Sequence, residues 1–257
     1  MQSTSVKNVF QFIFKNPKRL GELVHKAFLR FSKKDSTKDI AWIKNNQVSF
    51  RDWAEKIDPE AWKASEAFSK KLKEQAKAIL DGIPVKMGGG GLYPVLYFLT
   101  LYRRPRVILE TGVAAGFSSK TFLSALKENG MGTLYSSDFP YFRIANPEKY
   151  IGILVDEDLK DNWHLFIEGD KKNIPAILSE IDKIDLFHYD SDKSYDSRVY
   201  TFNLIKDKLH KDSYILFDDI QNNNHFKDMV LKNKYDYYVF EFEGKHVGLI
   251  YNYNPAK

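Results

Sequence analysis

The sequence has 257 residues, of which 43% are hydrophobic and 28% charged, with a formal net charge of +5. This length and composition favour one large α/β domain with an added segment. The chain has no cysteine, which excludes disulfides and thiolate chemistry and is typical of a reducing cytoplasm. No apolar run approaches the ~20 residues of a membrane span, and no signal-peptide cleavage pattern is present. We therefore expect a cytoplasmic protein.

The first 85 residues have a helical pattern. Asn16-Pro17 is typical of a helix start, and apolar residues continue at helical spacing to Phe31. Basic residues between Lys18 and Lys33 cover the other side of this predicted helix. The simpler interpretation is a cap helix whose apolar face docks on the rest of the chain. The alternative is a basic amphipathic helix that lies on an anionic membrane surface.

A second helix is predicted after a clear start signal. Asp58-Pro59-Glu60 is typical of a helix N-terminus, and Gly82 marks the end of the apolar stripe that follows. Between the two predicted helices, the pattern in residues 39–50 suggests a short hairpin.

The one glycine run of the chain lies at residues 88–91. Glycine backbone can approach a ligand closely, so Gly89 and Gly90 are candidate cofactor contacts, although the run could equally be a linker. We place the boundary here, with a helical cap segment at 1–85 and a second domain at 86–257. The apolar residues 92–104 then predict a helix laid against a sheet.

The stretch Arg106–Ser119 predicts a buried strand, a tight glycine turn and a helix N-terminus. Such an arrangement binds nucleotide-like cofactors through backbone N–H groups. Its spacing, with Glu110, Gly112 and Gly116, is E-x-G-x-x-x-G and not the G-x-G-x-x-G of dinucleotide sites. This motif alone could equally be structural.

Strands and helices alternate from Arg106 onward, which favours a mainly parallel sheet covered on both faces. The predicted strands are 107–111, 133–137, 164–167, 185–189 and 214–217, and a terminal antiparallel hairpin is predicted at 237–242 and 247–253. Acidic residues end each of the first five strands. Ligands of open α/β sheets bind at the carboxyl ends of strands, so these carboxylates predict a cationic or hydroxyl-rich ligand, a metal, or both.

These motifs, in this order, resemble class I S-adenosylmethionine-dependent methyltransferases across roughly residues 88–254. ETGVAAGFSS is similar to their first motif, and LFDDIQN resembles a metal-binding block at the end of strand five. DSDKSYD resembles blocks of the catechol and caffeoyl-CoA O-methyltransferases and of the macrolide-sugar O-methyltransferases. The resemblance implies a Rossmann-like fold with a mostly parallel seven-stranded sheet and an antiparallel terminal hairpin.

The resemblance also assigns the cofactor site. The turn after the first strand would meet the methionine carboxylate of S-adenosylmethionine, and Glu110 would lie near the amino group. Asp138 would accept the ribose hydroxyls, and Gly169-Asp170 would lie beside the adenine, although both aspartates could instead cap turns. The cofactor-binding set implied is Gly89, Gly90, Glu110, Gly112, Ala114, Gly116, Ser118, Asp138, Gly169, Asp170 and Asp190.

On the acceptor side, the resemblance implies a divalent metal, Mg²⁺ or a similar ion, held by Asp190, Asp218 and Asp219. Such an ion would hold the acceptor hydroxyl and lower its pKa. Lys193, three residues after Asp190, would act as general base if its pKa were lowered, while the alternative for it is a surface ion pair with Asp192. His225 is a reserve acid–base candidate.

The function predicted is therefore methyl transfer to a hydroxyl of a small molecule or saccharide. Two alternatives stay open: a metal-free methyltransferase of a macromolecule or lipid, docked through the basic N-terminal helix, and a non-catalytic protein of the same fold. No nucleic-acid partner is expected, because the core shows no basic patch with interleaved aromatic residues. Formation of a homo-oligomer stays open. Residues 140–162 are long enough to form a lid or substrate wall, with Arg143 as a candidate anion contact.

Overall fold

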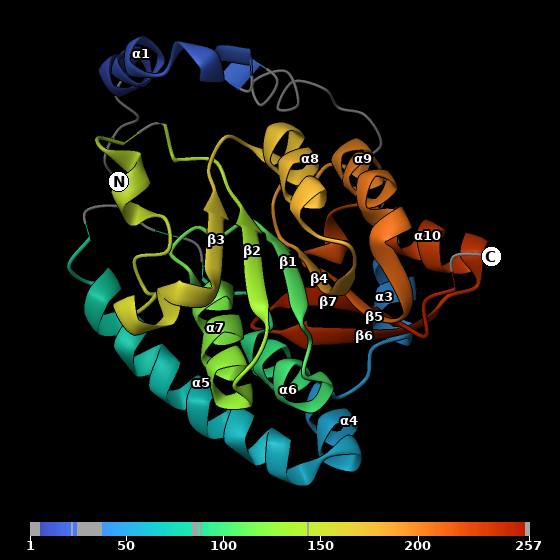
Figure 1. The fold of residues 1–257 in the computed structure, drawn as a ribbon. Helices are drawn as coiled ribbons and strands as arrows, with labels where there is room; N and C mark the ends of the chain where they lie inside the picture. The colour runs from blue at the N-terminus through green and yellow to red at the C-terminus, as the bar shows by residue number, and fades with distance from the viewer. Residues whose placement is uncertain are drawn as a thin grey trace.

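The computed structural model describes residues 6–21, 23–24, 38–83, 87, 89–142 and 144–254. Its centre is a seven-stranded sheet of order β3-β2-β1-β4-β5-β7-β6 (Figure 1). The strands are β1 Val107–Thr111, β2 Thr133–Ser137, β3 Trp163–Phe166, β4 Ile184–Tyr189, β5 Leu209–Phe217, β6 Asp236–Phe242 and β7 Lys245–Tyr251. The first five are parallel, and β7 inserts antiparallel between β5 and β6. The expected parallel sheet with a terminal antiparallel hairpin is confirmed.

Two layers of helices cover the sheet, because its buried strands present apolar side chains to both faces. One face packs against α4 Phe50–Ile57, α5 Pro59–Leu80, α6 Tyr93–Arg103 and α7 Phe117–Asn129. The other packs against α3 Ile40–Asn45, α8 Asp170–Glu180, α9 Tyr195–Ile205 and α10 His225–Asn233. Neighbouring strand residues alternate between the layers: Ile108 belongs to the first cluster and Leu109 to the second. Figure 1 shows the two layers on opposite sides of the strands.

The helix start predicted at Asp58 is confirmed. The Asp58 side chain accepts a hydrogen bond from the backbone nitrogen of Ala61 at 3.0 Å, and Pro59 is the first helical residue of α5. Trp62 and Leu72 of the predicted apolar stripe are buried, and Trp62 belongs to the first core cluster, whereas Ile79 near the helix end is 36% exposed. Capping and periodicity are local signals, which explains why this helix was readable from sequence.

The hairpin predicted at residues 39–50 is wrong. The side chains of Asp39 and Ser49 each cap a helix start, so the segment forms α3 and the beginning of α4. Its one strand-like feature is a bridge between Gln47 and Val239 of β6. Each of these two short helices is stabilised by its own cap, which accepts from a backbone N–H group that the helix start would otherwise leave unpaired.

The N-terminal region also departs from the prediction. A helix that was not predicted, α1 Val6–Lys15, precedes the expected start, and Asn16 donates from its side chain to the carbonyl of Phe12 at the end of α1. A 3₁₀ turn, η1 Pro17–Arg19, begins where the long helix was expected, and the described residues Leu20, Gly21, Leu23 and Val24 continue it in α-helical conformation. The predicted continuation to Phe31 lies outside the described residues beyond Val24.

Among the helices described, none combines the length and apolar character that crossing a bilayer requires.

Candidate active site

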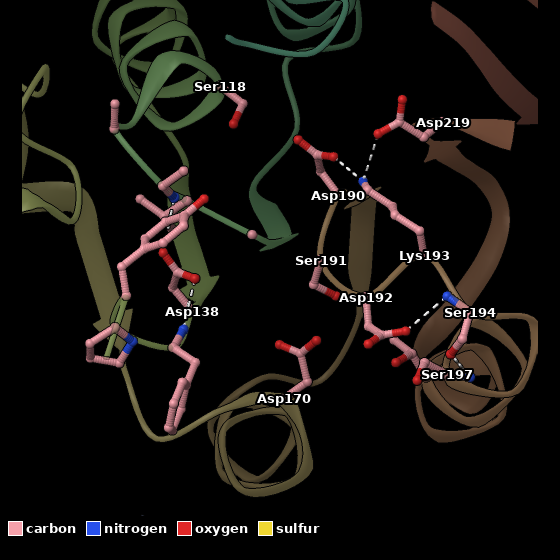
Figure 2. Close-up of a pocket in the computed structure, with 18 of the residues that line it drawn as sticks. Ser118, Asp138, Asp170, Asp190, Ser191, Asp192, Lys193, Ser194, Ser197 and Asp219 are labelled. Atoms are coloured by element: carbon pink, nitrogen blue, oxygen red, sulfur yellow. Dashed lines mark hydrogen bonds and ion pairs between the residues drawn. The ribbon is translucent and has the colours of Figure 1, made fainter. Parts of the chain in front are cut away.

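A cavity of about 1050 Å³ opens at the carboxyl ends of the parallel strands. The segments that follow β1 to β5 supply most of its polar side chains, and Figure 2 shows them facing one another from these separate elements. A cavity of this size can hold a nucleotide-like cofactor together with a small acceptor. The predicted site residues that line it are Gly89, Gly90, Gly112, Ala114, Ser118, Asp138, Asp170, Asp190, Lys193 and Asp219.

The turn after β1 has the backbone geometry that its glycines predict. Gly112 has a φ of +85°, and a Cβ there would lie 2.5 Å from the backbone oxygen of Asp190. Gly116, with a φ of +95°, begins α7, and a Cβ there would meet the Cα of Gly152 at 2.8 Å. The two glycines therefore let neighbouring loops pack tightly, while the N-terminus of α7 faces the cavity through Ser118. An N-terminus of this kind attracts carboxylates and phosphates.

Asp138 links the ends of two strands. It follows β2, and its carboxylate accepts hydrogen bonds from the backbone nitrogens of Ala114 at 2.9 Å and Phe139 at 2.7 Å. Two backbone donors fix the carboxylate at the cavity wall, and an ionised carboxylate has further lone pairs to accept from a ligand. Asp138 is therefore an oriented acceptor at the cavity wall.

Asp170 and Gly169 occupy different places. Asp170 is the first residue of α8; it lines the cavity and accepts a hydrogen bond from the hydroxyl of Ser137 at 2.5 Å. Gly169, with a φ of +90°, forms the turn before α8 and does not line the cavity. Of this predicted pair, Asp170 alone is brought to the site.

Lys193 stands between two carboxylates at the other side of the cavity. Its ammonium contacts Asp190 and lies 3.3 Å from the carboxylate of Asp219 (Figure 2). Lys245 of β7 approaches the same Asp219 oxygen at 3.7 Å. The alternative of an ion pair between Lys193 and Asp192 does not hold, because Asp192 instead accepts from the backbone nitrogen of Ser194 at 2.8 Å.

This cluster shifts the pKa values of its members. Burial, together with the charge of Asp218, raises the pKa of Asp190 to about 6. Burial lowers the pKa of Lys193, but Asp190 and the two following carboxylates outweigh it and raise the pKa above its usual value. The lowered pKa that a general-base lysine requires is therefore contradicted. Lys193 is a cation at neutral pH, and Asp190 titrates close to neutrality.

Asp218 lies behind this cluster, and it does not line the cavity. It is 1% exposed, its nearest charged neighbour is the Nε2 of buried His188 at 3.7 Å, and neither carboxylate oxygen receives a hydrogen bond from the described residues. Burial raises the pKa of Asp218, but His188 and Lys193 outweigh burial and lower it. In the described ranges, no three acidic or histidine side chains converge as a metal-binding group.

Glu110 was expected beside the cofactor, but the structure turns it away from the cavity. It is fully buried and accepts hydrogen bonds from the hydroxyls of Ser119 at 2.6 Å and Ser136 at 2.8 Å. Side chains alternate along a strand, so Glu110 shares the face of Ile108, which packs against the layer of α7. Its role is to tie β1 to β2 and α7.

His225, the reserve acid–base candidate, does not reach the cavity. It is 3% exposed, lies outside the cavity lining and contacts the rings of Tyr195 and Phe217. Burial, with a smaller effect from Arg198, lowers its pKa to about 3. A neutral, enclosed imidazole of this kind belongs to the core and not to acid–base chemistry at the cavity.

Arg198 is a residue that the sequence pattern did not single out. Its fully buried guanidinium donates to the backbone oxygens of Asp218 at 2.7 Å and Asp219 at 3.0 Å. It therefore holds the loop after β5 in place from α9. No local signal marks it, because its two acceptors are backbone groups about twenty residues away.

Comparison with known proteins agrees with this architecture. Residues 109–220 match the model of a family described as a methyltransferase domain. Over these residues the chain is similar to a methyltransferase domain. The motif resemblance noted in the sequence is thereby confirmed at the level of the class I methyltransferase fold. No curated protein sequence matches the chain.

Solved methyltransferases share the fold at low sequence identity. An O-methyltransferase of Bacillus cereus in complex with S-adenosylhomocysteine is 14% identical, with a TM-score of 0.54 over 71% of this chain and 90% of that one. An S-adenosylhomocysteine-bound methyltransferase of Podospora anserina is 15% identical, with a TM-score of 0.52 over 83% and 93%. A methyltransferase of Geobacter sulfurreducens is 15% identical, with a TM-score of 0.50 over 76% and 90%.

The N-terminal region contributes an apolar wall to this cavity. Val9 and Ile13 of α1 line it together with Leu23, and Phe12 packs on Phe139. Tyr141 and Phe142, from the long segment expected to form a lid or wall, also line the cavity. Arg143 of that segment lies outside the described residues.

Ion pairs between a buried arginine and two half-exposed glutamates fix this wall. Arg19 was expected on an exposed basic face, yet it is 6% exposed and contacts Glu168 at 2.5 Å and Glu148 at 2.6 Å. Glu168 lies two residues before the cavity-lining Asp170, so Arg19 anchors the N-terminal region next to the predicted adenine position.

Proposed function

We propose that the protein is an S-adenosylmethionine-dependent methyltransferase that transfers the methyl group to a hydroxyl oxygen of a small molecule or saccharide. The observation that carries this proposal is the shared cavity, in which Asp138 and the N-terminus of α7 face the Asp190–Lys193–Asp219 cluster. Asp138 and the N-terminus of α7 would bind the cofactor, and the Asp190–Lys193–Asp219 cluster would bind the acceptor.

The cofactor arrangement follows from charge and donor chemistry. The methionine carboxylate would meet the N-terminus of α7 near Ser118, where backbone N–H groups and the helix dipole favour an anion. Asp138 would accept the two ribose hydroxyls, because its orientation is already fixed by Ala114 and Phe139. Asp170, at the start of α8, would lie at the adenine end.

The acceptor side needs a proton acceptor and a positive charge. The acceptor oxygen would attack the methyl carbon, the carbon–sulfur bond would break, and S-adenosylhomocysteine would leave. The hydroxyl proton would pass to Asp190, whose pKa of about 6 suits a general base at neutral pH. The ammonium of Lys193 would stabilise the negative charge that develops on the acceptor oxygen.

The divalent metal expected from sequence does not fit the observed arrangement. Asp218 does not line the cavity, and the ammonium of Lys193 stands between Asp190 and Asp219, where a shared cation would have to displace it. We therefore assign the cationic role to Lys193 and derive no step through a metal.

Two measurements test the proposal. Calorimetry with S-adenosylhomocysteine should give specific binding that Asp138→Ala weakens, and absence of binding would favour the non-catalytic alternative. Transfer of labelled methyl from S-adenosylmethionine should then be screened against catechols and glycosides. Methyl transfer only to a macromolecular or lipid fraction would instead support the alternative noted from the sequence, in which the acceptor is a macromolecule or lipid.

A further inference from the structure

The N-terminal region is apolar on two sides. The inner side of α1 faces the cavity through Val9 and Ile13 and packs Phe12 on the domain. The outer side carries Phe10 and Phe14, one helical turn apart, which are 68% and 90% exposed. Packing against the domain therefore explains only one of the two apolar faces.

Further exposed apolar residues follow the end of α1. Leu20 and Val24, again four residues apart in helical conformation, are 46% and 61% exposed. We call Phe10, Phe14, Leu20 and Val24 the outer apolar face. Scattered exposed apolar residues are ordinary on protein surfaces, but four within fifteen residues form a concentration that indicates a partner.

The charge of this region is equally uneven. Residues 1–38 contain nine lysines and arginines against two acidic residues, a net charge of +7. Residues 39–257 contain 30 basic and 32 acidic residues, a net charge of −2. The positive charge of the whole protein therefore resides in the region that carries the outer apolar face, and Lys15 and Lys18 are exposed beside it. Aromatic residues with surrounding lysines are the composition that binds anionic bilayers.

The position of α1 suits contact with an extended surface. Figure 1 shows α1 beyond the ends of the strands, apart from the helices that cover the sheet. Its anchor is the ion pair of Arg19 with Glu168, and Lys172 of α8 donates to the backbone oxygen of Lys18 at 3.0 Å. The outer apolar face is thus held on the domain at the cavity wall and still turned to solvent.

We propose that the outer apolar face docks this protein on an anionic phospholipid bilayer, with Phe10 and Phe14 inserted at the interface and the neighbouring lysines on the headgroups. Because the inner side of the same helix lines the cavity, docking would bring the cavity wall to the membrane surface. The proposal does not depend on methyl transfer, since docking is measured without cofactor or acceptor.

The test is co-sedimentation of the full chain with vesicles. Wild-type protein should bind phosphatidylcholine vesicles that contain about one-third phosphatidylglycerol, bind pure phosphatidylcholine vesicles weakly, and dissociate at high salt. Phe10→Ser/Phe14→Ser should weaken binding at least roughly tenfold. Leu231→Ser, which alters a 50% exposed residue of α10, is the matched control and should bind as wild type.

Other outcomes overturn the proposal. Wild-type protein that stays in the supernatant with anionic vesicles at low salt would exclude docking, as would equal binding of the double variant. Equal binding of soluble short-chain phosphatidylglycerol would show headgroup recognition without a bilayer. Sedimentation velocity tests whether a second copy of the chain, and not a bilayer, covers the outer apolar face. A wild-type dimer that dissociates in the Phe10→Ser/Phe14→Ser variant would show this. Circular dichroism checks that the variants fold.

Discussion

The carboxylate of Asp138 accepts a hydrogen bond from the backbone nitrogen of Ala114 at 2.9 Å, which joins the end of β2 to the glycine turn after β1. This contact places an oriented carboxylate where ribose hydroxyls would bind. Asp138→Ala should therefore weaken S-adenosylhomocysteine binding by roughly 10- to 100-fold. This factor corresponds to the free energy that hydrogen bonds to a charged group contribute to binding. Calorimetry measures it, with Asp161→Asn as the exposed control. Unchanged affinity would remove Asp138 from the cofactor site.

Lys193 is expected to act through its charge. If so, Lys193→Met should lower kcat by at least roughly 100-fold, while Lys193→Arg should retain a measurable fraction of activity. Arginine keeps the positive charge but cannot serve as a base, because it is not deprotonated in proteins. The comparison is made on kcat, with cofactor affinity measured in parallel. If Lys193→Arg is as inactive as Lys193→Met at unchanged affinity, the purely electrostatic role is wrong.

Chelation gives an independent test of the same cluster. With Lys193 between Asp190 and Asp219, we expect methyl transfer to persist after treatment with EDTA. The assay compares initial rates before and after chelation and after addition of Mg²⁺. A loss of activity that Mg²⁺ restores would reinstate the metal site expected from sequence and show that a cation displaces the lysine.

Arg19 anchors the N-terminal wall. Arg19→Met should lower the free energy of unfolding by about 1–2 kcal/mol, because the arginine is buried although its two glutamate partners are half-exposed and partly screened by solvent. Denaturant unfolding measures the change. Lys127→Met, which breaks an exposed ion pair with Asp158, should change the free energy of unfolding far less, because solvent screens that pair. Similar losses in both variants would contradict a special role for Arg19.

His225 should make the protein sensitive to acid. Its pKa in the folded state is about 3, below the ordinary value of 6.5, so the unfolded chain binds a proton first as the pH falls. Stability from this group is complete above the ordinary pKa and declines as the pH falls toward 3. By pH ~4.5 the loss is about 3 kcal/mol.

His225→Gln removes the titrating group. Its free energy of unfolding should therefore decline less than that of wild type between neutral pH and pH ~4.5, whatever its value at neutral pH. Denaturant titrations across this range give the comparison. Parallel pH profiles for the two proteins would show that protonation of His225 does not oppose folding.

Local signals in the sequence determined much of the fold. Asp58-Pro59 fixed the start of α5, apolar runs located the strands, and the E-x-G-x-x-x-G spacing located the turn before α7. These features depend on residues within one or two turns of each other, so they can be recognised without knowledge of the tertiary structure. The acidic residues at strand ends could also be interpreted from the sequence. Parallel strands present their carboxyl ends at one edge of the sheet, so these residues were expected to gather there.

Only the tertiary structure decided how those residues are used. Glu110 and Asp138 both end strands, but strand alternation buries Glu110 against α7 while backbone donors turn Asp138 to the cavity. The charge state of Lys193 depends on carboxylates from two strands, and no spacing within one segment reveals their combined field. Burial of Arg19 likewise required Glu168, 149 residues away. The sequence by itself determined which chemical groups gather at the sheet edge, and long-range packing decided which of them face the cavity and with what charge.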